Sequence, residues 1–133
     1  MEHHEDLEQV AIMRWAGFTR IPGTNEPISN YLIHIPNGGK RNVREATRFK
    51  RMGVKAGVAD LFLAYPMGTM PGLWLELKKQ ERHFSTPALV RLSVKPNQRE
   101  WLERMSAVGY MVDVCFGADA AILRIKSYLG VPL

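Results

Sequence analysis

Apolar and polar residues follow two different periods along this chain, one typical of helices and one typical of strands. Apolar residues recur three or four positions apart near the start, in a basic segment, before Gly109 and near the end. Short apolar runs bounded by Pro and Gly are typical of strands. The sequence predicts helices over residues 5–16, 41–52, 96–108 and 118–129, and strands over residues 31–35, 61–65, 73–79 and 110–116.

The helical periods also predict which side of each helix is buried. Pro96 suits the first position of the third predicted helix, and Gly109 supplies its C-terminal stop. The expected buried faces consist of Leu7, Val10, Ala11 and Trp15, of Val43, Ala46, Phe49 and Met52, of Trp101, Leu102, Met105 and Val108, and of Ala121, Ile122, Ile125 and Leu129.

The order of these elements, α-β-α-β-β-α-β-α, predicts an α/β fold with a mixed sheet flanked by helices. The chain has 133 residues, which fits a single domain over residues 1–133 with room for a substantial core. Residues 80–95 are polar and basic without a clear period, so we expect them to leave that core.

Two acids and a lysine stand out within the apolar strands. Asp60 directly precedes one strand, and Glu76 and Lys78 lie two positions apart in the next, so they share a face. Such a triplet alone also fits a solvated strand face. However, Leu73 to Leu77 supplies apolar residues to both faces, and charged groups are rarely buried unless they are paired or bind a metal. Two carboxylates and a lysine suit metal-assisted hydrolysis of a phosphodiester.

Positive charge is concentrated in one segment. The formal net charge of the chain is +5, and residues 40–55 hold seven Lys and Arg residues against one acid. A basic stripe is typical of nucleic-acid binders, and a solvated helix face is the alternative. The candidates for DNA binding are Lys40, Arg41, Arg44, Arg48, Arg51 and Lys55.

The turn at residues 36–39 gives a further candidate. Asn37, together with Gly38 and Gly39, is a candidate for bringing backbone N–H groups close to a phosphate, and a plain turn is the alternative. The neighbouring His34 lies in a predicted strand, where we expect a satisfied core histidine.

Several classes of protein are disfavoured. No apolar run approaches the ~20 residues that span a bilayer, and the acidic N-terminus lacks the layout of a signal peptide. Cys115 is the single cysteine, so we expect a buried core thiol and no disulfide framework or Cys/His metal site. An intracellular location in the cytoplasm fits best.

Several motifs occur together in a characteristic order. They are Glu8-Gln9, residues 34–39, residues 53–61, Glu76-Leu77-Lys78, residues 96–102 and Gly109-Tyr110. Over roughly residues 5–128, this series resembles the virus-type replication-repair nuclease (VRR-NUC) domain of the PD-(D/E)XK superfamily. One departure is Ala59, where the family usually has Pro before the metal-binding Asp; because that Pro is not a ligand, the chemistry is little affected.

The resemblance implies a restriction-endonuclease-like fold and a Mg²⁺- or Mn²⁺-dependent DNA endonuclease. Asp60, Glu76 and the carbonyl of Leu77 would bind the cation, and Lys78 would orient the attacking water. Gln98 would help to position the site, with a solvent-facing role as the alternative. Glu8 resembles an acid on the family's first helix, either an additional ligand or an outer group, and a surface acid is the alternative.

Stand-alone members of the family occur in phages, and the resemblance also implies a homodimer that cuts branched DNA such as four-way junctions. Two other hypotheses remain open. One is a degenerate member that binds DNA structures without cutting them, which the intact Asp60, Glu76 and Lys78 disfavour. The other is a restriction-like processing nuclease, which the absence of an appended recognition domain disfavours.

Overall fold

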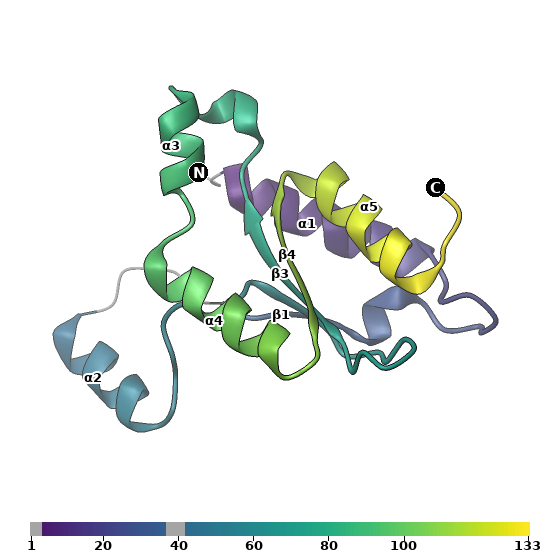
Figure 1. The fold of residues 1–133 in the computed structure, drawn as a ribbon, viewed down its shortest axis with the longest axis horizontal. Helices are drawn as coiled ribbons and strands as arrows, with labels where there is room; N and C mark the ends of the chain where they lie inside the picture. Colours follow the sequence, from purple (N-terminus) through teal and green to yellow (C-terminus); the bar gives the residue numbers. More distant parts are fainter. Residues whose placement is uncertain (1–3, 37–41) are drawn as a thin grey trace.

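The computed structural model describes residues 4–36 and 42–133, which form a four-stranded mixed sheet flanked by helices (Figure 1). The predicted fold class is confirmed. In chain order the elements are α1 (His4–Phe18), η1 (Ile28–Asn30), β1 (Leu32–His34), α2 (Val43–Arg51), β2 (Leu61–Leu63), β3 (Leu73–Lys78), η2 (Glu81–His83), α3 (Pro87–Leu92), α4 (Pro96–Ala107), β4 (Met111–Phe116) and α5 (Ala118–Leu129).

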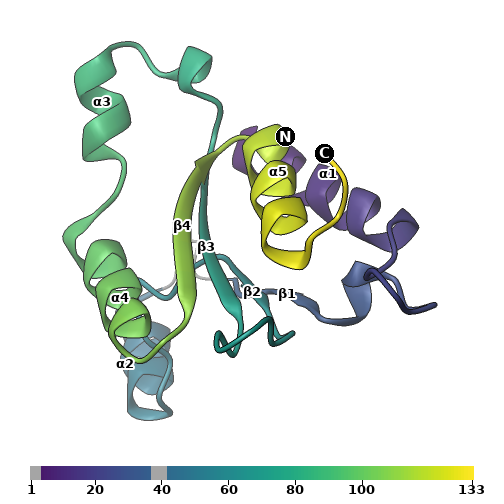
Figure 2. The ribbon, with the colours of Figure 1, turned by 45° about the vertical axis from the view of Figure 1, so that its right-hand side comes forward.

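The strands lie in the order β1-β2-β3-β4. β2 pairs antiparallel with both β1 and β3, whereas β3 and β4 are parallel because α4 connects them across the sheet. The helices α1 and α5 pack on one face of the sheet and α4 packs on the other (Figure 2). None of the helices formed by the described residues is long and apolar enough to cross a membrane.

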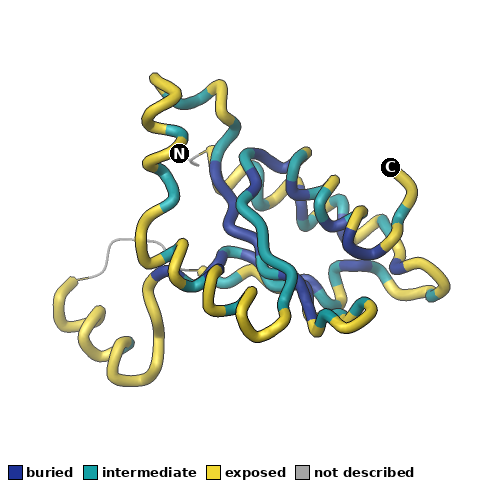
Figure 3. Tube along the Cα trace, viewed as in Figure 1, coloured by how far each residue is buried: buried dark blue, intermediate teal, exposed yellow. Residues whose placement is uncertain are grey.

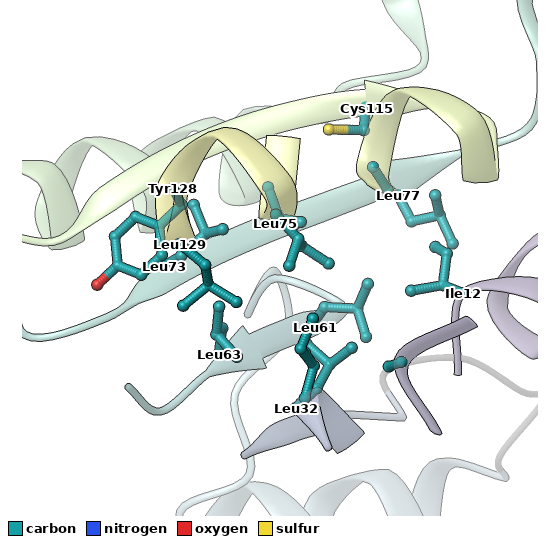
Figure 4. Close-up of a cluster of buried hydrophobic side chains, with 14 of the residues drawn as sticks. Ile12, Leu32, Leu61, Leu63, Leu73, Leu75, Leu77, Cys115, Tyr128 and Leu129 are labelled. Atoms are coloured by element: carbon teal, nitrogen blue, oxygen red, sulfur yellow. The ribbon is translucent and has the colours of Figure 1, made fainter. Parts of the chain in front are cut away.

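The hydrophobic core lies between the sheet and the helices α1 and α5 (Figure 4). β3 is buried over most of its length, as its apolar residues on both faces predict. Leu61, Leu75 and Ile125 are among the side chains that are completely or almost completely buried. On the α4 face, Trp74 stacks on Phe62 and meets Trp101 edge-on.

The predicted buried face of α1 is wrong, although the helix itself is confirmed. Ile12 and Ala16 are its buried residues, whereas Leu7 and Val10 are about half exposed. Apolar residues occur all around this helix, so the pattern does not define one face, and packing against the sheet and α5 selects Ile12. The predicted faces of α4 and α5 are confirmed except at Val108, which is exposed.

Two helical segments extend away from the core (Figure 3). α2 forms as predicted, but none of its residues is buried, and its expected buried face is therefore wrong: Val43 is 83% exposed and the neighbouring Met52 70%. Residues 80–95 leave the core as expected and contain no buried residue. That segment includes η2 and α3, which the sequence analysis missed because each is too short to show a period.

Candidate active site

Asp60, Glu76 and Lys78 lie together on the sheet face opposite the core. Asp60 directly precedes β2, and Leu61 pairs with Leu75, so Asp60 lies beside the C-terminal half of β3. Successive side chains of a strand point to opposite faces. Leu75 is buried in the core, so Glu76 and Lys78, one and three positions later, both point to the opposite face of the sheet. Asp60 lies on that same face and interacts with both side chains.

The ammonium group of Lys78 is held by two partners. Its Nζ lies 3.6 Å from Glu76 Oε1 and donates a hydrogen bond of 2.9 Å to Gln98 Oε1. The same amide oxygen accepts the backbone N–H of Lys95 at 2.9 Å, so Gln98 also caps the start of α4. Lys78 is only 7% exposed. Gln98 therefore fixes the lysine against the first turn of a packed helix.

Glu76 is a buried carboxyl with an unsatisfied oxygen. The residue is 2% exposed, and its Oε2 has no hydrogen-bond partner among the described residues. Burial and the nearby Asp60 carboxylate raise the pKa of Glu76 to about 8, against the opposing effect of Lys78. Buried polar atoms are rarely left without a partner. The two neighbouring carboxyls of Asp60 and Glu76 therefore need a proton or a bound cation at neutral pH.

Asp60 is positioned by backbone groups of neighbouring strands. Its Oδ2 accepts the N–H of Leu77 at 2.7 Å, and its carbonyl accepts the N–H of Ile35 at 2.7 Å. Burial raises the pKa of Asp60, although the Leu77 N–H and the Lys78 ammonium lower it in part. His34 Nδ1 lies 3.0 Å from the Asp60 carbonyl, and this histidine is exposed. Its expected place in the core is wrong.

The carbonyl of Leu77 faces the same side as these carboxylates. In a strand, the N–H and C=O of one residue point to the same neighbour, and the Leu77 N–H points to Asp60. β2 begins only opposite Leu75, so no β2 residue pairs with Leu77. Asp60, Glu76 and Leu77 thus offer oxygen atoms, the ligand type that Mg²⁺ and Mn²⁺ prefer.

This set fits a hard cation that keeps some of its water ligands. Within residues 4–36 and 42–133, no three His, Cys, Asp or Glu side chains gather closely enough to form a cage of side chains alone. Mg²⁺ is commonly held by one or two carboxylates together with water and substrate oxygens. The unsatisfied Glu76 oxygen and the paired carboxyls meet that requirement.

Glu8 and Glu5 occupy different environments. Glu8 accepts the Gln80 amide at 2.7 Å through Oε1 and the backbone N–H of Ala118 at 2.6 Å through Oε2. It therefore joins α1 to the N-terminus of α5. Glu5 instead lines a cavity with Lys78, and partial burial raises the pKa of its carboxyl, with Lys78 opposing the shift. The sequence pattern does not single out Glu5, because it lies among several acids near the N-terminus.

Gly57 fixes the approach to the site. Its φ of +89° disfavours other residues, and a Cβ atom there would lie 2.6 Å from the carbonyl oxygen of Asn97 in α4. Glycine therefore lets the chain before Asp60 pass against the first turn of α4, next to Gln98.

The basic candidates divide into described and undescribed residues. Arg44, Arg48 and Arg51 lie on α2 with spacings of four and three, so they share one side of the helix. Together with Thr47 and Met52 they line a concave surface with a volume of about 520 Å³. Lys55 is exposed beyond α2. Asn37, Gly38, Lys40 and Arg41 lie outside the described residues.

Cys115 is a buried thiol on β4, as predicted. Burial raises its pKa to about 12, with Asp113 adding to the shift. A thiol of that kind remains protonated near neutral pH and is a poor nucleophile.

Comparison with known proteins found a similarity among solved structures. No family model matches the chain, and no curated protein matches it. Among solved structures, one described as "VRR_NUC domain protein" superposes with a TM-score of 0.77 at 31% sequence identity. The match covers 98% of this chain and 92% of that protein.

Proposed function

This chain belongs to the VRR-NUC family, and from that membership and its site we propose that it is a metal-dependent endonuclease acting on DNA. The observation that carries the proposal is the partly buried Asp60 and the buried Glu76 beside Lys78, with one glutamate oxygen left without a hydrogen-bond partner among the described residues. Buried ionisable groups with perturbed pKa values are typical of catalytic sites.

Asp60, Glu76 and the Leu77 carbonyl would hold Mg²⁺ or Mn²⁺. When bound, the cation supplies charge for the scissile phosphate and acidifies a water ligand. Lys78 provides a fixed positive charge for the developing oxyanion and a donor for the attacking water. Gln98 keeps the Lys78 Nζ in place through the hydrogen bond of 2.9 Å.

The basic side of α2 supports DNA as the substrate. Arg44, Arg48 and Arg51 are exposed and lie along one side of a helix without buried residues. A helix that presents cations to solvent is suited to contacting phosphates, which dominate affinity for DNA without selecting sequence.

Four-way junctions and other branched DNA are the proposed targets, and a symmetric homodimer is the proposed active form. Each chain has one cluster of Asp60, Glu76 and Lys78, whereas paired cuts across a junction require two. A C₂ dimer supplies two identical centres related by the symmetry of the junction. The family membership favours this arrangement over a monomer.

A panel of linear duplex, flaps, forks and four-way junctions, incubated with Mg²⁺, Mn²⁺ or EDTA, tests the activity. The parent chain should cut only with a divalent cation. Asp60→Asn and Lys78→Ala should each lower the rate by about a hundredfold or more, whereas Glu103→Gln and Lys126→Ala, outside the site, should not. Binding without cutting in both metals would instead identify a DNA-binding module.

The dimer is tested separately. Light scattering should give about twice the chain mass of 15.1 kDa. Mixed dimers of parent and Lys78→Ala chains should nick one strand of a junction without resolving it. A monomer that makes paired cuts would disprove the dimer and leave the nuclease proposal standing.

A further inference from the structure

A cavity with a volume of about 590 Å³ lies directly beside the candidate active site. It is bounded by the start of α1, the end of β3 and the segment that contains η2 and α3. Its volume is within the range of small-molecule binding sites. The lining residues that matter here are Glu5, Lys78, Phe84, Leu89, Leu92 and Lys95.

One wall of this cavity is apolar. Leu89 and Leu92 of α3 are 46% and 66% exposed, and their spacing of three places them on one side of the helix. Phe84 lies between this helix and the sheet, where its ring meets Phe116 edge-on. These apolar side chains thus line the same cavity as Lys78 instead of being buried in the core.

The lining of the cavity also carries positive charge. Lys78, Lys79 and Lys95 all line it, against the single acid Glu5. The Lys79 ammonium also lies 4.6 Å from the centre of the Phe84 ring, which joins the apolar wall to the lysines. An apolar surface next to several cations complements a nucleotide, whose base is flat and apolar on its faces and whose phosphate is an anion.

We propose that this cavity receives one unpaired nucleotide of the DNA, next to the phosphate that is cut. The inference rests on the proposed nuclease function, since Lys78 belongs to both the site and the cavity. A base in a duplex is stacked and paired, and it has to leave the helix before it can enter a pocket of this kind. Bases at branches and mismatches leave at the lowest cost, so the cavity selects distorted DNA over regular duplex.

Leu89→Ala combined with Leu92→Ala removes the apolar wall while keeping residues that favour a helix. Both side chains are exposed, so the fold should be retained, as circular dichroism would verify. Val108→Ala combined with Leu123→Ala is the matched control, because these residues are 64% and 51% exposed and lie outside the cavity.

The decisive measurement is a double-mutant cycle, in which one change is made in the protein and the other in the DNA. The cut is first mapped on a substrate with an unpaired nucleotide, and that nucleotide is then replaced by an abasic analogue that keeps its phosphate. For the parent chain, loss of the base should lower kcat/KM by about tenfold, the size of one base stacked on a protein side chain. For the Leu89/Leu92 variant the same replacement should have less than about a threefold effect, because the wall is already missing.

Fluorescence anisotropy in EDTA repeats the cycle as binding constants, without catalysis, and the same pattern is expected. Equal losses for the parent and the Leu89/Leu92 variant would overturn the subsite. A control variant that loses its sensitivity to the base, as the Leu89/Leu92 variant is expected to, would also overturn it. If the parent cuts DNA but treats paired and unpaired nucleotides alike, only the subsite is overturned. If it cuts no DNA with either metal, the proposed function fails and the subsite fails with it.

Discussion

Gln98 holds Lys78 and the N-terminus of α4 with the same oxygen atom, since Oε1 accepts both the lysine Nζ and the backbone N–H of Lys95 at 2.9 Å. The orientation of the lysine therefore depends on how α4 packs against the sheet. A hydrogen bond to a charged group is typically worth about 1.5–3 kcal/mol.

Gln98→Leu should lower kcat by about tenfold or more, because the lysine loses its partner. Gln98→Glu keeps an acceptor oxygen and should retain most of the activity. Single-turnover cutting rates and the affinity for DNA in EDTA separate positioning from binding. A Gln98→Leu chain with normal kcat would show that Glu76 alone orients the lysine.

Glu8 and Glu5 should respond oppositely to the same substitution. Glu8→Gln cannot accept both of its N–H donors as a carboxylate does, so the free energy of unfolding should fall by about 1–2 kcal/mol with little loss of cutting. Glu5→Gln should leave stability nearly unchanged and lower the cutting rate by about tenfold, because its carboxyl lies beside Lys78. Urea unfolding and cutting assays on both variants check this, and the reverse pattern would support Glu8 instead of Glu5 as a residue of the active site.

The raised pKa of Glu76 makes the stability of the metal-free protein depend on pH. Between the ordinary value of 4.5 and the folded value of about 8, the unfolded chain loses a proton that the folded chain keeps. The free energy of unfolding therefore falls as pH rises through this range, by up to about 1.4 kcal/mol per unit from this group.

Glu76→Gln should flatten that dependence and make the metal-free protein more stable at pH 8 by about 1 kcal/mol or more. Urea unfolding in EDTA at pH 5, 6.5 and 8 measures the effect. The exposed Glu103, changed to Gln, is the control and should keep the slope of the parent. An unchanged slope in Glu76→Gln would mean that this carboxyl is ionised at neutral pH without a cation.

Gly57→Ala should be more harmful than Gly53→Ala, although both glycines have positive φ. At Gly53 a Cβ atom meets nothing within 4 Å, whereas at Gly57 it overlaps the Asn97 carbonyl. We expect a loss of about 1–3 kcal/mol at each site from conformation alone, with an additional loss at Gly57 from the displaced α4. Thermal unfolding and kcat should both distinguish the variants, and equal effects would exclude the contact as the cause.

Arg48→Gln combined with Arg51→Gln should weaken binding to all DNA shapes. Each lost phosphate contact flattens the plot of log affinity against log salt concentration by about one unit. Removing the same charge with Arg104→Gln and Lys126→Gln, away from α2, is the control. A salt slope equal to that of the parent would show that α2 is a solvated helix without contacts to DNA.

The sequence by itself determined the main helices and strands and the grouping of Asp60, Glu76 and Lys78. The period of two in β3 places Glu76 and Lys78 on one face, and the apolar residues around them predict burial, as the structure confirms. The helices α4 and α5 were predictable for the same reason, since each has a regular apolar stripe. These features depend on local geometry, which neighbouring residues specify.

The tertiary structure decided everything that depends on which surface covers which residue. The pattern in α1 left its buried face open, and contact with the sheet and α5 chose Ile12, directed Glu8 to Ala118 and left Glu5 beside Lys78. In α2 the apolar stripe exists in the sequence, but none of the residues of this helix is buried. Periodicity specifies which residues share a side, whereas burial requires a partner from a distant part of the chain, and that partner is set only when the whole fold forms.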